Sequence, residues 1–310
     1  MILNLVFIVV GIALVLWGAD RLTDGAVALA DRMGISQIVI GLTVVAMGTS
    51  MPEFTISLLS AIKGTSGLAV GNVIGSNIFN SLLIVGTSAV VAPMLILKST
   101  VRKDIPFALV ASVMLYLLSQ DGQISRWDAA ILFVFFMIFM TITIKESKSA
   151  DSKKEDTQIK SIKVWKAVAF LLIGLTGLIL GSNIFVNGAT KLATTLGVSD
   201  AVIGLTIVAG GTSLPELATS VVASRKGNSG IAIGNVLGSN VFNILMILGI
   251  TGLITPMSIH GITQVDLTML VVSMILLWLF SFTKYRIERW EGAILSILFI
   301  GYIVYLILQI

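Results

Sequence analysis

The sequence has no cysteine, a single histidine and few charged residues. Of its 310 residues, 12% are charged and 56% are hydrophobic, whereas soluble globular domains carry about 25% charged residues. The absence of cysteine excludes disulfide bonds and thiolate metal sites. The shortage of charge excludes an ordinary soluble domain. The net charge of +4 is better explained by basic residues at cytoplasmic helix ends than by nucleic-acid binding, so no nucleic-acid partner is expected.

Apolar residues form ten blocks that approach or reach the roughly 17 to 25 residues of a transmembrane helix, without the alternation typical of barrel strands. The blocks are 2–18, 38–62, 68–91, 105–119, 129–144, 168–185, 202–223, 231–254, 267–282 and 292–308. No basic region precedes the first block and no cleavage pattern follows it, which predicts a retained span rather than a signal peptide. The sequence therefore predicts an all-α, multi-pass protein of the cell membrane, in contact with the lipid bilayer.

The chain contains an internal repeat with a constant offset of 163 residues. VIGLT at Val39 recurs at Val202, and GNVIGSNIFN at Gly71 recurs as GNVLGSNVFN at Gly234. The only long polar stretch, 145–166, separates the two copies and is predicted to be a solvated linker. We therefore divide the chain into a first five-span half (1–144), the linker (145–166) and a second five-span half (167–310).

The distribution of basic residues predicts the orientation of the two halves. Because five is odd, the second unit enters the membrane from the opposite side. Placing the amino terminus outside and the linker in the cytoplasm puts seventeen of the twenty Lys and Arg residues inside, and leaves only Lys63, Arg126 and Lys191 outside. This positive-inside asymmetry predicts ten transmembrane helices arranged as two inverted five-helix repeats.

The second and seventh blocks carry the motifs GTSMPE, ending at Glu53, and GTSLPE, ending at Glu216. The proline in each motif removes a backbone donor and disfavours helical geometry in the residue before it, which predicts a broken helix. A carboxylate at bilayer depth is costly unless it faces a cavity or a cation. The break would expose backbone carbonyls beside the polar side chains of each motif, which are Thr49, Ser50 and Glu53, and Thr212, Ser213 and Glu216.

The third and eighth blocks add small and polar residues that predict a second surface of the same site. Glycines four residues apart let helices approach closely, and the paired polar residues share one helix face; these are Ser76 and Asn80, and Ser239 and Asn243. We therefore predict that broken helices 2, 3, 7 and 8 form the core. Carbonyl, hydroxyl, amide and carboxylate oxygens suit a hard cation such as calcium or sodium. One calcium, or two sodium ions, would balance the two glutamates.

The doubled motifs closely resemble the two alpha-repeats of the cation/calcium exchanger superfamily, in its sodium/calcium exchanger branch. The resemblance covers the whole chain and implies a calcium/sodium antiporter that works by alternating access, with no cofactor and no obligate protein partner. It implies that Glu53 and Glu216 bridge calcium and sodium. It further implies ligands from the backbone carbonyls of Ala46, Thr49, Ala209 and Thr212, from the hydroxyls of Ser50, Ser76, Ser213 and Ser239, and from Asn80 at the centre.

The chain departs from some relatives, including potassium-dependent ones, which carry aspartate where this chain has Asn243. The site then has two carboxylates rather than three. A proton-coupled or potassium-assisted calcium antiporter and an organic-solute carrier remain alternatives. An intramembrane hydrolase is disfavoured, because Ser50 and Ser213 lack an activating base, so no enzyme activity is expected.

Two further features are interpreted as surface elements. Asp20 and Asp24 flank Arg21 and are predicted to form a solvated end of the first span. His260, the only histidine, follows Pro256 in a predicted external loop.

Overall fold

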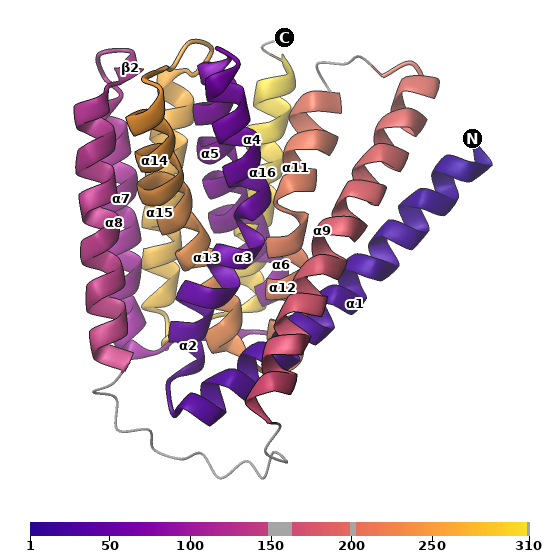
Figure 1. Ribbon diagram of the computed structural model, residues 1–310, viewed down its shortest axis with the longest axis vertical. Coiled ribbons are helices and arrows are strands. Elements are labelled where there is room, and N and C mark those ends of the chain that lie inside the picture. The colour runs from indigo at the N-terminus through magenta and orange to yellow at the C-terminus, as the bar shows by residue number, and fades with distance from the viewer. Residues whose placement is uncertain (148–162, 199–202, 309–310) are drawn as a thin grey trace.

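A computed structural model describes residues 1–147, 163–198 and 203–308. The central part of the predicted linker, 148–162, lies outside the described residues. Within them the chain is predominantly helical (Figure 1). Seven of the described helices are long and apolar enough to cross a membrane, and the bent pair Gln37–Thr49 and Met51–Ile62 makes an eighth candidate. The protein is therefore a helical, multi-pass membrane protein.

The first half contains helices, three π-helical segments (η) and two short strands. They are α1 (Ile2–Met33), α2 (Gln37–Ile40), η1 (Gly41–Val45), α3 (Ala46–Thr49), α4 (Met51–Ile62), α5 (Ser66–Ile78), η2 (Phe79–Ile84), α6 (Val85–Val91), β1 (Met94–Leu95), η3 (Thr100–Asp104), α7 (Ile105–Leu118), β2 (Gln123–Ile124) and α8 (Arg126–Ser147).

The second half follows a corresponding order. Its elements are α9 (Val164–Thr195), η4 (Gly204–Val208), α11 (Ala209–Thr212), α12 (Leu214–Arg225), α13 (Ser229–Val241), η5 (Phe242–Ile247), α14 (Leu248–Ile254), β3 (Met257–Ser258), α15 (Gln264–Ser281), β4 (Arg286–Ile287) and α16 (Arg289–Leu308).

The 163-residue offset recurs in the elements themselves. α4, α5 and β1 begin at residues 51, 66 and 94, and α12, α13 and β3 begin at residues 214, 229 and 257. β1 pairs with β4 and β2 pairs with β3, both antiparallel, so each two-stranded ribbon joins one half to the other. In Figure 1 the path from α2 to α4 runs upward and the path from α11 to α12 runs downward.

α1 and α9 cross the molecule side by side and lean away from the other helices (Figure 1). Each has 32 residues, about 48 Å at 1.5 Å per residue, which exceeds the bilayer core and is consistent with a strong tilt. Both helices extend well beyond the predicted blocks 2–18 and 168–185. Glycines permit the contact, because a Cβ on Gly18 would lie 2.7 Å from the Gly174 carbonyl oxygen, and a Cβ on Gly174 would lie 2.5 Å from the Leu22 nitrogen.

The third and eighth blocks are continuous helices, so the prediction that they are broken is wrong. Ser66–Val91 and Ser229–Ile254 are each a single helix of 26 residues. Neither contains proline, and the backbone accommodates its irregularity as the π-helical segments η2 and η5 within the helix. Such segments are frequent at functional sites.

α13 lies at the centre of the molecule and contacts α2, α3, α7 and α12. α13 begins the 26-residue helix Ser229–Ile254. In the 18-residue apolar stretch of that helix, 83% of the residues are buried, whereas only 22% are buried in the corresponding stretch of α1. Close packing of α13 on the second block depends on Gly234 and Gly238, whose Cβ atoms would lie 2.7 Å from the Ile38 carbonyl oxygen and 2.6 Å from that of Leu42. The polar centre of the protein is thus surrounded by helices rather than lipid.

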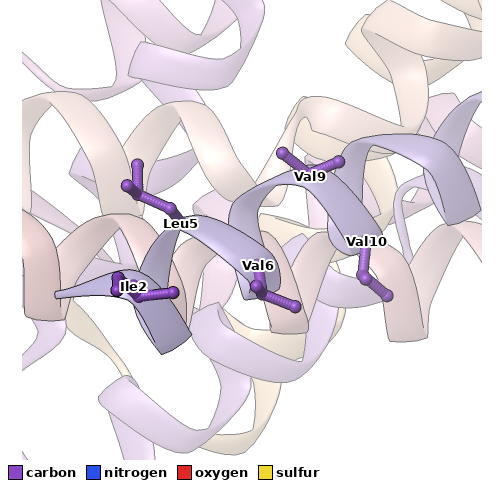
Figure 2. A pocket seen from close by; sticks show the side chains of 5 residues that line it. All are labelled: Ile2, Leu5, Val6, Val9 and Val10. Atoms are coloured by element: carbon purple, nitrogen blue, oxygen red, sulfur yellow. The ribbon is translucent and has the colours of Figure 1, made fainter.

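The outer helices expose apolar side chains, as a bilayer requires. A shallow hollow of about 270 Å³ on α1 is lined by Ile2, Leu5, Val6, Val9 and Val10 (Figure 2). Its lining offers no polar side chain, so this hollow belongs to the lipid-facing surface and is not an ion site.

We expect Gly18→Val to lower the free energy of unfolding by about 1 to 3 kcal/mol or more, because the side chain would force α1 and α9 apart. Thermal unfolding of the purified protein measures the effect. Gly301→Val on α16 is the matched control, because no atom lies within 4 Å of its added Cβ. Equal unfolding midpoints for the two variants would contradict the close crossing.

Candidate ion-binding site

Two helix breaks place the glutamates. Between α3 and α4, Ser50 leaves helical geometry (φ −83°, ψ 5°), and between α11 and α12 Ser213 does the same (φ −88°, ψ 7°). The two segments around Ser50 are bent by 47°. A break is therefore present at each proline motif, but one residue earlier than predicted, because Met51 and Leu214, the residues before the prolines, already begin α4 and α12. Glu53 and Glu216 lie in the first turn of the helix after the break, and both are fully buried.

Each glutamate accepts a hydrogen bond from the motif of the other half. Ser213 Oγ donates to Glu53 Oε1 at 3.0 Å, and Ser50 Oγ donates to Glu216 Oε1 at 3.1 Å. The motifs, 163 residues apart in sequence, therefore face each other at one site. No Lys or Arg lies in the segments that carry and surround them, which are 37–62, 66–91, 203–224 and 229–254. Arg225 follows in the last turn of α12, away from Glu216 in its first turn.

Four buried oxygens of this site have no hydrogen-bond donor among the described residues. They are Glu53 Oε2, Glu216 Oε2, Asn80 Oδ1 and Asn243 Oδ1. Leaving one buried acceptor unsatisfied costs about 1 to 3 kcal/mol, and more when it is charged. The four oxygens occur as two symmetry-related pairs, and all are acceptors, so a cation would satisfy them together.

The serines assigned to the site by resemblance are buried within it. Ser76 Oγ and Ser213 Oγ lie 2.9 Å apart, which links α5 to the second break. Ser239, the counterpart of Ser76, is fully buried, and its hydroxyl has no partner among the described residues. Ser76 therefore already has a hydrogen-bond partner, whereas Ser239 does not.

The threonines and alanines of the predicted ligand set lie at the two breaks. Thr49 Oγ1 donates to Asn235 Oδ1 at 3.0 Å, and the Thr212 hydroxyl hydrogen-bonds to Glu53. The Ala46 carbonyl accepts the Ser50 backbone N–H at 3.0 Å, and the Thr49 hydroxyl lies 3.4 Å from the same oxygen. Ala209 is the first residue of α11.

Asn72 and Asn235 support the glutamates and were not predicted as site residues. Asn72 Nδ2 donates to the Glu53 carbonyl oxygen at 3.3 Å, and Asn235 Nδ2 donates to the Glu216 carbonyl oxygen at 3.2 Å. These amides tie α5 and α13 to the first turns of α4 and α12. The sequence does contain a signal for them, because each asparagine follows the first glycine of a repeated motif, as Gly71-Asn72 and Gly234-Asn235. The glycines of that motif were interpreted as packing residues, and the asparagines were not assigned a role.

The end of the first span is paired rather than simply solvated, which corrects the prediction. Lys226 Nζ lies 2.5 Å from Asp20 Oδ1 and 2.7 Å from Asp24 Oδ1. Lys226 follows α12, so these ion pairs connect the middle of the longer α1 to the second half. Their side chains are 30 to 37% exposed, and such pairs contribute about 0 to 1 kcal/mol.

The described residues contain no second cluster of metal-binding side chains. Among the described residues, no group of three or more of these side chains is placed to hold a metal ion. His260 is exposed and hydrogen-bonds to Ser258, as a surface position would. The candidate site therefore depends on two carboxylates supplemented by neutral oxygens.

We expect Asn235→Leu to lower the free energy of unfolding by about 1 to 3 kcal/mol, because it removes the buried amide that bonds to the Thr49 hydroxyl, the Glu216 carbonyl and the Ser220 hydroxyl. Thermal unfolding measures the loss. Asn187→Leu, at an exposed position on α9, is the control. A midpoint for Asn235→Leu equal to that of the control would contradict the supporting role of the amide.

Comparison with known proteins gives matches over nearly the whole chain. The family described as sodium/calcium exchanger protein matches residues 3–145 and 166–308. The putative antiporter CaxA of Alkalimonas amylolytica is 37% identical over 312 residues, covering 97% of this chain and 98% of the relative. The sodium/calcium exchanger MaX1 of Methanosarcina acetivorans is 32% identical, covering 98% of each chain.

A solved structure has the same fold. The sodium-calcium exchanger NCX_Mj, in a form soaked with Na⁺ and Ca²⁺, superimposes with a TM-score of 0.86 at 34% identity and covers 98% of both chains. The sequence match and the structural match extend over both halves and both motifs. The protein therefore belongs to the sodium/calcium exchanger family.

Proposed function

We propose that this protein is a secondary antiporter that exchanges Ca²⁺ for Na⁺ at a site shared by Glu53 and Glu216. The observation that carries the proposal is a pair of fully buried carboxylates, each with one oxygen that lacks a donor among the described residues. No Lys or Arg lies in 37–62 around Glu53 or in 203–224 around Glu216. Two buried charges of like sign need compensation. A transported cation would supply it.

The donor set favours calcium and sodium over other cations. Its oxygens come from carboxylates, amides, hydroxyls and carbonyls, which suit hard cations. One Ca²⁺ or two Na⁺ would neutralise the two glutamates. Both ions accept irregular oxygen cages, whereas Mg²⁺ requires a tighter octahedron. Competition of calcium and sodium for the same carboxylates would couple their movements in opposite directions.

We assign the central ligands to the oxygens that lack donors, those of Glu53, Glu216, Asn80 and Asn243. Hydroxyl and carbonyl groups at the two breaks would complete the coordination around them. These supplementary ligands are Ala46, Thr49, Ser50, Ser76, Ala209, Thr212, Ser213 and Ser239. Ser239 is the best supported of these supplementary ligands, because its buried hydroxyl has no hydrogen-bond partner among the described residues.

For transport, we propose a ten-span arrangement of two inverted repeats. The matching order of elements and the opposite runs of α2–α4 and α11–α12 support it (Figure 1). The seven long helices and the bent pair supply eight of the ten spans. The ninth and tenth would be formed by η3 with α7, and by η4 and α11 with α12. The amino terminus lies outside and the linker in the cytoplasm, and the site alternates between the two sides of the membrane.

The site does not favour an organic solute. The pocket in Figure 2 is apolar, and a second one on α8 has a single threonine, Thr141, among apolar residues such as Val134 and Met137; both lie on outer helices. The buried polar region instead presents small oxygen ligands and no cationic side chain for a substrate carboxylate. Whether sodium, protons or potassium drive the exchange is tested below by imposing each ion gradient separately.

We expect Glu53→Gln and Glu216→Gln each to reduce calcium flux by about 100-fold or more, because each removes half of the charge that balances calcium. Flux is measured in proteoliposomes with an imposed sodium gradient. Glu288→Gln is the control, because Glu288 lies between β4 and α16 and pairs with Arg286 at 2.6 Å. Normal flux in either buried variant would contradict a shared site.

The coupling ion is tested by imposing sodium, potassium and proton gradients separately on the same proteoliposomes. We expect the sodium gradient alone to drive calcium uptake, because sodium matches calcium in size and in its choice of oxygen ligands. Uptake driven by a proton gradient without sodium would replace sodium by protons in the proposal. A strict requirement for potassium would show a different ion stoichiometry.

A further inference from the structure

We infer that Asn77, Asn240 and Met274 are positioning residues that hold the amides of Asn80 and Asn243 with their oxygens free for the cation. The inference rests on the proposed ion site and deepens it. An amide side chain is nearly symmetric in shape, yet only its oxygen can ligate a cation. Neighbouring side chains must therefore fix the orientation of each amide, so that its oxygen rather than its nitrogen faces the ion.

The Asn80 amide is oriented by a chain of hydrogen bonds that ends in a thioether. Asn80 Nδ2 donates to Asn240 Oδ1 at 3.1 Å, and Asn240 Nδ2 donates to Ser81 Oγ at 2.8 Å. Ser81 Oγ in turn donates to Met274 Sδ at 3.1 Å. A thioether sulfur can only accept, so Met274 sets the direction of every bond in the chain.

The direction of this chain leaves one atom without a partner. Because Asn240 presents its oxygen to Asn80, the nitrogen of Asn80 must face Asn240. Asn80 Oδ1 is then the end that remains buried and without a donor. Reversing Asn80 would place two amide oxygens against each other and turn a donor nitrogen toward the cation, which is repulsive in both places.

The Asn243 amide is oriented by a separate group of acceptors. Its Nδ2 donates to Ser76 Oγ and to Asn77 Oδ1, both at 3.2 Å. Asn77 is itself fixed because its Nδ2 donates to the Asn240 backbone carbonyl at 3.5 Å, and a carbonyl oxygen can only accept. Asn243 Oδ1 is left buried without a donor, as Asn80 Oδ1 is.

The two routes differ between the repeats. The counterparts of Ser81 and Met274, at the 163-residue offset, are Ile244 and Ala111. Neither can hydrogen-bond through its side chain, so the thioether anchor exists only once. Met274 lies on α15, a helix that supplies none of the proposed ligands, and it is fully buried. An outer helix thereby sets the orientation of a central ligand.

The test compares the asparagine at position 80, whose amide must be oriented, with an aspartate at the same position, whose two oxygens are equivalent. Asn240→Leu removes the acceptor for the Asn80 amide, and we expect it to raise the half-saturating Ca²⁺ concentration by about tenfold or more, as loss of an outer partner does at metal sites. In the Asn80→Asp background the same change should cost less than about threefold, because an aspartate presents an oxygen in either rotamer. Calcium binding to the purified full-length protein and sodium-driven flux measure both.

Two methionine variants complete the experiment and keep it informative if Asn240→Leu does not fold. Met274→Leu preserves volume but removes the sulfur acceptor, and we expect about a two- to fivefold rise in the half-saturating Ca²⁺ concentration at unchanged maximal flux. Met269→Leu, half-buried on the same helix, should change neither quantity.

The outcomes separate this inference from the proposed function. Equal losses for Asn240→Leu in the two Asn80 backgrounds, or equal behaviour of Met274→Leu and Met269→Leu, would overturn positioning while leaving the calcium site intact. Absence of calcium binding in the unmodified protein would instead overturn the proposed function. A loss confined to the Asn80 background, with the maximal flux retained, supports the orientation of the amide as the cause.

Discussion

The structure depends on one electrostatic constraint, the burial of two carboxylates without a basic partner. Glu53 and Glu216 are fully buried, and no Lys or Arg lies in the segments that carry and surround them, 37–62, 66–91, 203–224 and 229–254. A buried charge without compensation is strongly unfavourable. The site therefore has to combine hydrogen-bond donors for one oxygen of each carboxylate with room for a cation at the other. The crossed bonds from Ser213 and Ser50 provide the first part.

The surrounding architecture follows from the need to bring polar atoms from two halves to one place. The helix break in each half lies against the glutamate of the other half, and amides from α5 and α13 hold the backbone of the two glutamates. Glycines at Gly234 and Gly238 let the central helix approach the second block closely. The long helices α1 and α9 lie outside this centre, where a glycine-mediated contact joins them.

Much of this could be predicted from the sequence, because prolines and repeats act through local rules. The motifs at Glu53 and Glu216 predicted to within one residue where the helices break, and the 163-residue offset predicted which elements correspond. The continuous course of Ser66–Val91 was not predicted, since a π-helical segment leaves no proline or glycine signature of its own. The hydrogen-bond chain from Asn80 through Asn240 and Ser81 to Met274 could not be predicted from the sequence either, because its residues lie on three helices and come into contact only when those helices pack.

The most direct test of the central claim is anomalous diffraction from crystals of this protein soaked with Ca²⁺ or Sr²⁺. The account predicts one principal peak that contacts Glu53 Oε2 and Glu216 Oε2 at about 2.3 to 2.6 Å, with the side-chain oxygens of Asn80 and Asn243 turned toward it. A fully occupied peak bound to only one of the two glutamates, or no peak between them, would contradict a single shared cation site.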